Sequence, residues 1–371
     1  MSGQDPELSR RDMLKLLSLG AGAWILAACS QVKGLQSLVT LTPKELYQLT
    51  GDLVTSTAGT TPAPILKGDL LPTGFEAGRI TPIEDFFVQS YAGIAKPNPE
   101  SWQLDISGLV ANPLQIDLTE LRMRPARQIM VTLECIGNPV GGGLIGNAMW
   151  AGVPLADILH DAGILPEARH ILFHCEDGYR TSVEVDVALH ERSTLAFMMN
   201  GQELPVAHGY PVRVIFPGVY GQKQPKWVVS IRVSATDSLG TWEEKGWSNQ
   251  AEIQVNSRIE TPKIQQKIPS GYPFYITGMA MAATSGVQKV EVSVDDGLSW
   301  QEATLLSGSH TGVWTLWYWV WNDPRPGEYV LVAKATDGNG KTQETSREQG
   351  FSGNVFPNGT SYAHRVRVQV V

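Results

Sequence analysis

Residues 128–159, QIMVTLECIGNPVGGGLIGNAMWAGVPLADIL, place a single thiol between an apolar strand and a glycine-rich turn. Residues 129–134 are β-branched and apolar enough to predict a buried strand, which the Gly, Asn and Pro residues of 137–143 cannot continue. Cys135 is therefore expected at the mouth of a strand, where glycines would let backbone N–H groups approach an anionic or planar ligand. A second interpretation stays open here, a buried structural cysteine before an ordinary loop.

Cations interrupt two apolar strands further along the chain. They lie in residues 208–221, HGYPVRVIFPGVYG, and at Lys226, with strands predicted at 212–216 and 227–233. A cation among buried strands needs an anionic partner, and the planar fork of Arg213 with the point charge of Lys226 suits a terminal phosphate. Ion pairs at exposed strand ends are the alternative.

These blocks, together with the sequence WAGVPL at 150–155, resemble in order and spacing the sulfite oxidase family of molybdenum enzymes, over about residues 75–371. The resemblance implies an α+β fold. A mixed α/β molybdopterin-binding catalytic domain would span residues 75–250, and an immunoglobulin-like dimerisation domain would span residues 251–371. It also implies a molybdenum–molybdopterin cofactor, with the metal bound by the soft thiolate of the catalytic Cys135.

The resemblance also implies the other cofactor contacts. His208, Arg213 and Lys226 match its pterin-binding positions, while Gln224 and Pro225 would give backbone contacts. Strand-end ion pairing is the alternative for His208 as well as for the two longer cations.

Three positions match the family less closely. Gln89, Ser90 and Tyr91 stand where the family carries Arg-Asn-His near the cofactor, so the contact expected from Tyr91 is altered. Cys175 falls where members place a residue near the pterin, and a buried core thiol is the alternative. Cysteine count alone would also allow a Cys135–Cys175 disulfide, but a domain of this size needs no such staple.

Two departures from the resemblance concern the substrate. Pro139 stands where sulfite-oxidising members have an Arg that helps to bind the oxyanion, and Leu239 aligns with their Tyr at the open face of the metal. Without that cation and phenol, sulfite would be poorly neutralised in a desolvated pocket. We therefore expect an oxidoreductase for two-electron oxygen-atom transfer to or from a small molecule other than sulfite. Trp242 and Trp247 either line the pocket or pack in the core.

Two alternatives to this function are kept. One is a reductase for sulfoxide-type substrates, and the other is a cofactor-inert surface binding module of the same fold. The carboxylates of Glu176, Asp177 and Glu184 are expected to be solvated rather than paired for acid–base catalysis, and His174 is expected to be a core residue.

The first 29 residues predict a targeting signal rather than part of the folded protein. Residues 1–29 read as a twin-arginine lipoprotein signal, with SRRDMLK at 9–15, a short apolar run and a lipobox-like LAAC at 26–29. Cys29 would be lipidated, and residues 30–74 would be a linker. We therefore expect an extracytoplasmic protein, periplasmic or at the cell surface, anchored to a membrane by lipid. A leader without lipidation is the alternative.

The chain of 371 residues is 42% apolar and 18% charged, which suffices for two domains. Its formal charge of -8 argues against a general nucleic-acid binder. No Cys-x-x-Cys-His motif for a c-type haem occurs, so electrons would pass to an external partner such as a cytochrome or a quinone-linked protein. The second domain of the family implies a homodimer.

Local patterns predict further elements, with a tryptophan-rich β-sandwich at the end of the chain. They are a hairpin over residues 102–118, a helix over 154–162, and strands over 171–176, 287–294, 314–321, 327–337 and 365–371.

Overall fold

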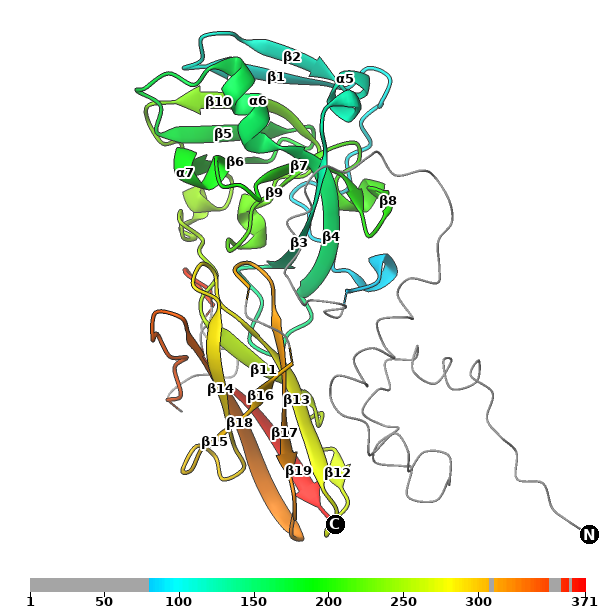
Figure 1. Cartoon of the computed structure of the whole chain (residues 1–371), viewed down its shortest axis with the longest axis vertical. Helices are drawn as coiled ribbons and strands as arrows, with labels where there is room; N and C mark the ends of the chain where they lie inside the picture. Colours follow the sequence, from blue (N-terminus) through cyan, green and yellow to red (C-terminus); the bar gives the residue numbers. More distant parts are fainter. Residues whose placement is uncertain (1–79, 307–309, 347–354, 360–361) are drawn as a thin grey trace, which may run out of the picture.

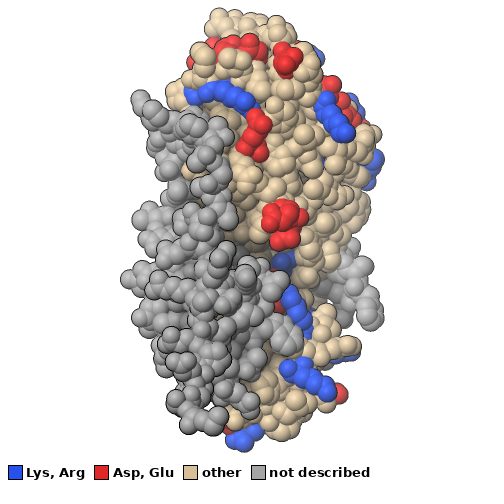
Figure 2. Space-filling model, turned by 90° about the vertical axis from the view of Figure 1, so that its right-hand side faces the viewer, with Lys and Arg blue, Asp and Glu red and all other residues tan. Residues whose placement is uncertain are grey.

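The computed structural model describes residues 80–306, 310–346, 355–359 and 362–371, and the predicted signal, Cys29 and linker lie outside these residues. Figure 1 shows two groups of β-sheets stacked along the long axis of the molecule, with the earlier strands in one group and the later strands in the other. On the face that Figure 2 draws, Lys and Arg are scattered and form no continuous basic patch.

Two sheets build the N-terminal half. Their strands are β1 (Gln103–Gly108), β2 (Leu114–Asp117), β3 (Arg127–Glu134), β4 (Ile145–Pro154), β5 (His170–Cys175), β6 (Arg180–Glu184), β7 (Thr194–Met199), β8 (Gln202–Glu203), β9 (Arg213–Ile215) and β10 (Val228–Ser234). One sheet has the order β2-β1-β10-β5-β6, in which β1 and β10 are parallel. The other has the order β3-β4-β7-β8, and β9 also pairs with β7.

The helices of the described residues are short. They are α5 (Leu118–Met123), α6 (Leu155–Ala162), α7 (Val185–Ala188) and the 3-10 turns η1 (Ile83–Asp85), η2 (Val206–His208), η3 (Gly221–Lys223) and η4 (Glu243–Lys245). Helix α6 ends at Gly163, whose φ of 68° is the left-handed conformation that glycine adopts readily. Because the α-helices have 6, 8 and 4 residues, the chain is mostly β and the predicted α+β label is not confirmed. None of the described helices is long and apolar enough to cross a membrane.

The C-terminal half is a sandwich of two sheets. Its strands are β11 (Asn256–Thr261), β12 (Lys267–Ile268), β13 (Phe274–Met281), β14 (Val287–Ser293), β15 (Gln301–Glu302), β16 (Thr304–Leu305), β17 (Thr315–Trp321), β18 (Gly327–Asp337) and β19 (His364–Val370). The sheet orders are β11-β13-β17-β16 and β12-β19-β18-β14-β15. Trp317 and Trp321 of β17 are buried in the core between the sheets, as the immunoglobulin-like pattern predicts.

The other predicted elements are also present. The hairpin over 102–118 is β1 and β2, the helix over 154–162 is α6, and the strand over 129–134 is β3. Cys135 follows β3 directly, so its expected place at a strand mouth is confirmed.

The two halves pack against each other close to Cys135. An apolar cluster joins Ile136 and Tyr220 of the first half to Met279 and Trp314 of the second. At the same junction the hydroxyl of Thr132 accepts a 2.9 Å hydrogen bond from the Trp314 N–H. The loop after Cys135 therefore lies between the halves, and its shape depends on both.

Candidate active site

A cavity of about 320 Å³ opens beside Cys135. Its walls come from chain segments that are far apart in the sequence. They include Phe86, Tyr91, Cys135, Gly137, Asp177, Tyr179, His208, Arg213, Gln222, Gln224, Lys226, Trp227, Trp242 and Trp247. Several residues singled out in the sequence thus meet in one place.

Cys135 is half-buried, and backbone hydrogen bonds fix it. Its N–H donates to the Leu144 carbonyl at 2.9 Å, and its carbonyl accepts from the Asn138 N–H at 2.9 Å. Both Cys135 and Cys175 are free thiols, so the alternative of a disulfide between them is wrong. Burial raises the pKa of the Cys135 thiol, and a bound metal cation would lower it again.

The glycine-rich turn after Cys135 is used differently from our expectation. Only Gly137 of this turn lines the cavity. A Cβ on Gly141, whose φ is +86°, would lie 2.4 Å from Nε2 of His364, and a Cβ on Gly142 would lie 2.4 Å from Oδ1 of Asn138. Gly141 therefore allows close packing against the C-terminal sandwich, and Gly142 allows close packing within the turn itself, rather than close approach to a ligand.

A buried carboxylate lies next to Cys135. Glu134 accepts hydrogen bonds from Nδ2 of Asn138 at 3.0 Å and from Nδ2 of Asn256 at 3.3 Å. Asn256 belongs to the C-terminal half, and all three side chains are buried. Burial raises the pKa of Glu134 to about 7, although both amides and Arg258 favour its charged form.

Arg213 and Lys226 bring two cations to the cavity, and no carboxylate of the described residues is bonded to either. The Arg213 guanidinium donates to the carbonyls of His208 at 2.9 Å and Gln224 at 3.3 Å, and its buried Nε has no partner among the described residues. The Lys226 ammonium donates to the Ala207 carbonyl at 2.9 Å. Burial lowers the pKa of Arg213 to about 9. Burial and the charge of Arg213 together lower the pKa of Lys226 to about 7.

His208 is held as a neutral imidazole. Burial and the neighbouring Arg213 lower its pKa to about 4. Its ring stands edge-on to Phe86, with centroids 5.5 Å apart. One ring nitrogen of His208 hydrogen-bonds to the Ile83 backbone, so at neutral pH the other ring nitrogen is the one that can contact a ligand.

The remaining candidates differ in their access to the cavity. The side chain of Gln224 is occupied by the backbone of Phe216 and Val219. Its N–H donates to the Gly221 carbonyl at 3.0 Å and its carbonyl accepts from Arg213, so that carbonyl's second lone pair is what remains for a ligand. Pro225 and Cys175 are buried and are not among the lining residues. Burial raises the pKa of the Cys175 thiol, which makes it an inert core thiol in this environment.

Aromatic rings cover much of the wall, and the sequence did not single out most of them. Tyr91 stands edge-on to Trp242 at 6.4 Å and lies 6.2 Å from Tyr179. Trp242 and Trp247 both line the cavity, so the pocket alternative holds for both. Leu239 is 49% exposed and does not line the cavity.

Trp227 carries backbone strain at the wall. Its φ is 53°, in the left-handed region that bulky residues rarely adopt. Its indole N–H donates to the Val206 carbonyl at 2.9 Å, and the ring is fully buried. The Lys226 ammonium lies 4.3 Å from the Trp227 ring centroid, so the strained residue also supports a cation.

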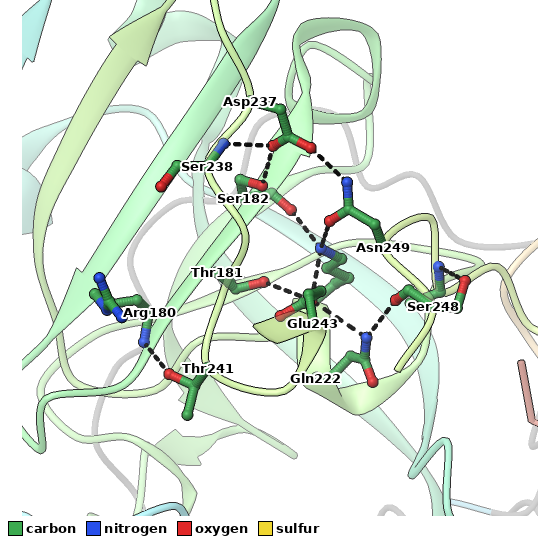
Figure 3. Close-up of polar contacts among 12 residues, drawn as sticks. Arg180, Thr181, Ser182, Gln222, Asp237, Ser238, Thr241, Glu243, Ser248 and Asn249 are labelled. Carbon is green, nitrogen blue, oxygen red and sulfur yellow. Dashed lines mark hydrogen bonds and ion pairs between the residues drawn. The ribbon is translucent and has the colours of Figure 1, made fainter. Parts of the chain in front are cut away.

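A buried ion pair lies behind the aromatic wall. Lys223 of η3 and Glu243 of η4 approach to 2.7 Å, with side chains 1% and 0% exposed. The ammonium also donates to the Ser182 carbonyl at 2.8 Å and to Oδ1 of Asn249 at 3.2 Å. Figure 3 shows Ser182, Gln222, Glu243 and Asn249 gathered in this polar cluster. Gln222, which lines the cavity, donates to the same Glu243 oxygen at 3.2 Å. This pair ties together the two turns that carry the wall.

The other predicted polar residues have minor places. Glu176 and Glu184 are exposed, as expected. Asp177 is half-buried and lines the cavity, so it is not the fully solvated surface carboxylate that the sequence predicts. His174 is half-buried rather than part of the core, and burial lowers its pKa.

Known proteins share this architecture. A family model described as oxidoreductase molybdopterin binding domain matches residues 91–242, and one described as Mo-co oxidoreductase dimerisation domain matches residues 248–369. Sulfite oxidase of Gallus gallus is 30% identical over 315 residues, which are 72% of this chain and 68% of that protein. The chain belongs to the sulfite oxidase family of molybdenum oxidoreductases.

Two further comparisons, one with a relative and one with a solved structure, help to define the match. Mitochondrial sulfite oxidase of Mus musculus is 30% identical over 348 residues, 79% of this chain but 62% of that protein, so the chain spans less than two thirds of the mouse enzyme. Sulfane dehydrogenase SoxCD from Paracoccus pantotrophus has the same fold, with a TM-score of 0.67 at 22% identity, covering 84% of this chain and 89% of that chain. The predicted sulfite-oxidase-like fold is thereby confirmed.

Membership of the sulfite oxidase family means a molybdenum–molybdopterin cofactor, and the cavity fits one. The buried Nε of Arg213, which has no partner among the described residues, and the depressed pKa of Lys226 are features that suit the binding of an anion. The described residues contain no group of three or more His, Cys, Asp or Glu that could hold a metal by themselves. A metal here would therefore need ligands from the cofactor besides the thiol of Cys135.

Proposed function

We propose that this protein catalyses two-electron oxygen-atom transfer at a molybdenum centre ligated by Cys135. The observation that carries this proposal is the meeting of one free thiol and two carboxylate-free cations in the same cavity. When bound, the cofactor supplies a metal that can exchange an oxygen atom and two electrons with a substrate.

In this proposal the side chains divide the work of holding the cofactor. Arg213 and Lys226 bind its phosphate, because a fork and a point charge together neutralise a terminal phosphate. His208 adds a neutral hydrogen-bonding group, and Gln224 adds backbone contacts. Tyr91 borders the cavity where other members carry a histidine, so its phenol contributes a different hydrogen bond.

We further propose that the substrate is not sulfite. The charged side chains among the described lining residues are Arg213, Lys226 and Asp177. If the first two hold the cofactor phosphate, the cavity walls retain no cation for a second anion. Pro139 is exposed and supplies none either.

We propose a homodimer, an external electron carrier and an extracytoplasmic location on the basis of the sequence. The match of residues 248–369 to a dimerisation domain supports a homodimer. The signal proposed for residues 1–29 supports twin-arginine export and a lipid anchor on Cys29. Electrons would then pass to or from an external carrier, such as a cytochrome or a quinone-linked protein.

The test is the metal and pterin content of protein made in a host that synthesises the cofactor. Wild type should contain about one molybdenum and one pterin per chain. Cys135→Ser should keep the pterin but change the molybdenum spectrum, because the soft ligand is lost. Arg213→Met should lose pterin, whereas the exposed variant Leu239→Ala should match wild type. Folded wild-type protein without metal or pterin would refute the proposal and favour a cofactor-inert binding module.

A further inference from the structure

The two cations of the cavity lie together at one end. A Cβ on Gly209 would lie 2.9 Å from Cβ of Arg213 and 3.2 Å from Cβ of Lys226, so the two side chains leave the backbone side by side. Their heads bond to the neighbouring carbonyls of His208 and Ala207. Under the proposed function, both cations serve one phosphate.

The wall beside the thiol is aromatic instead. A Cβ on Gly137 would lie 3.9 Å from both Sγ of Cys135 and Cη2 of Trp247, so the sulfur and the indole edge flank Gly137 in the same cavity. Trp247 packs edge-on against Phe356 at 5.1 Å, and Phe356 is 50% exposed. The apolar surface thus continues from the thiol toward solvent.

The buried ion pair fixes this wall in place. Glu243 follows Trp242 directly in η4, and the N–H of Trp247 donates to the Trp242 carbonyl at 3.3 Å. The bond from Glu243 to Lys223 anchors that turn to η3. Since the rings are held before any ligand arrives, binding a flat group against them costs little conformational entropy.

One cation faces this wall from the solvent side. The Lys245 ammonium lies 4.3 Å from the Trp242 ring centroid and 5.4 Å from that of Tyr91. Lys245 is exposed, and an ammonium in water neutralises an anion only weakly. It does not replace a buried arginine.

We infer that the substrate end of the cavity binds an uncharged molecule that carries a flat apolar group, and that Trp247 is the residue that selects it. This inference rests on the proposed function, because it gives Arg213 and Lys226 to the cofactor. A ring stacked on Trp247 would lie next to Cys135, with the polar end of the substrate free to face the metal. A small anion would gain nothing from that surface.

The test uses three unreactive probes, so it needs no turnover. Methyl phenyl sulfone is neutral and flat, dimethyl sulfone is neutral without a ring, and sulfate is an anion. Holoenzyme is titrated with each by calorimetry, with molybdenum and pterin assayed on the same sample. Methyl phenyl sulfone should bind at least about ten-fold more tightly than dimethyl sulfone or sulfate, as expected for burial and stacking of one ring.

Variants assign that preference to the wall. Trp247→Ala should weaken methyl phenyl sulfone about ten-fold and leave dimethyl sulfone unchanged, while Trp247→Phe should retain most of the preference. Leu239→Ala, an apolar truncation outside the cavity, should behave as wild type. Unchanged molybdenum content and circular dichroism would show that the variants are folded and loaded.

The two proposals can fail separately. Loaded enzyme that binds sulfate best, or whose preference survives Trp247→Ala, overturns this inference and leaves the proposed function standing. Loss of sulfate binding in Lys245→Gln would then identify the cation responsible. Protein that never acquires molybdenum overturns the proposed function itself.

Discussion

Replacing Glu243 by Gln removes one charge from an ion pair that has almost no contact with water. At the observed 2.7 Å, an effective dielectric constant of about 20 gives an attraction of roughly 6 kcal/mol, against which the desolvation of both ions must be set. Loss of one partner from a buried pair typically costs about 3–5 kcal/mol. Lys223 keeps the Ser182 carbonyl and Asn249 as acceptors, so we expect about 3 kcal/mol.

Lys223→Met should cost more, because Oε2 of Glu243 already has no partner among the described residues and its charge would stay buried. The double variant should lose less than the sum of the singles, by at least about 1.5 kcal/mol. Urea unfolding followed by tryptophan fluorescence measures all three. The control is Glu244→Gln, which breaks the exposed pair with Arg180 and should change stability by less than about 0.5 kcal/mol. Additive losses in the double variant would show that the pair is not coupled and would refute this account of the wall.

Three further changes test other parts of the site. Asn256→Ala removes one hydrogen bond to buried Glu134 and should lower the free energy of unfolding by about 1–3 kcal/mol. It should also shift the electron paramagnetic resonance spectrum of the molybdenum, and an unchanged spectrum would exclude positioning of the Cys135 loop by the C-terminal half. Gly141→Ala should cost at least about 1 kcal/mol in thermal unfolding, since φ is +86° and the new methyl would meet His364; wild-type stability would contradict the packing described. Burial lowers the pKa of Lys226 from 10.5 to about 7, so between these values the unfolded chain binds more protons and cofactor-free protein should become more stable as pH rises. Bound phosphate should restore the charge and flatten that dependence in urea midpoints at pH 7 and 9.5.

The sequence predicts the cofactor end of the site better than the substrate end. Cys135 follows a largely apolar strand and Arg213 lies within another, so pattern and charge single them out as candidates, and the family resemblance implies their roles. None of the predicted elements covers most of residues 145–154, where strand β4 lies. In the structure Gly152 is needed there, since a Cβ on it would lie 1.9 Å from the Leu195 carbonyl oxygen.

The aromatic wall leaves no comparable signal in the sequence. Trp242 and Trp247 lie in a turn, where the sequence has no hydrophobic periodicity that could distinguish a cavity-lining residue from a core residue. Lys223 and Glu243 meet only because η3 and η4 fold against each other, and a charge in a short turn normally predicts exposure. Leu239 aligns in sequence with a substrate-contacting position, but an alignment carries no information on the local backbone. In the structure its side chain lies outside the cavity.

The cavity therefore has two ends built in different ways. Arg213 begins β9 and Lys226 directly precedes the strained Trp227 at the start of β10, so any shift of the cofactor end would disturb both sheets. Trp242 and Trp247 belong to a turn that one buried ion pair holds, so that turn can change its side chains while the sheets stay fixed. Under the proposed function, such a division would allow one cofactor site to serve different substrates, since the residues proposed to choose the substrate are separate from those proposed to hold the cofactor.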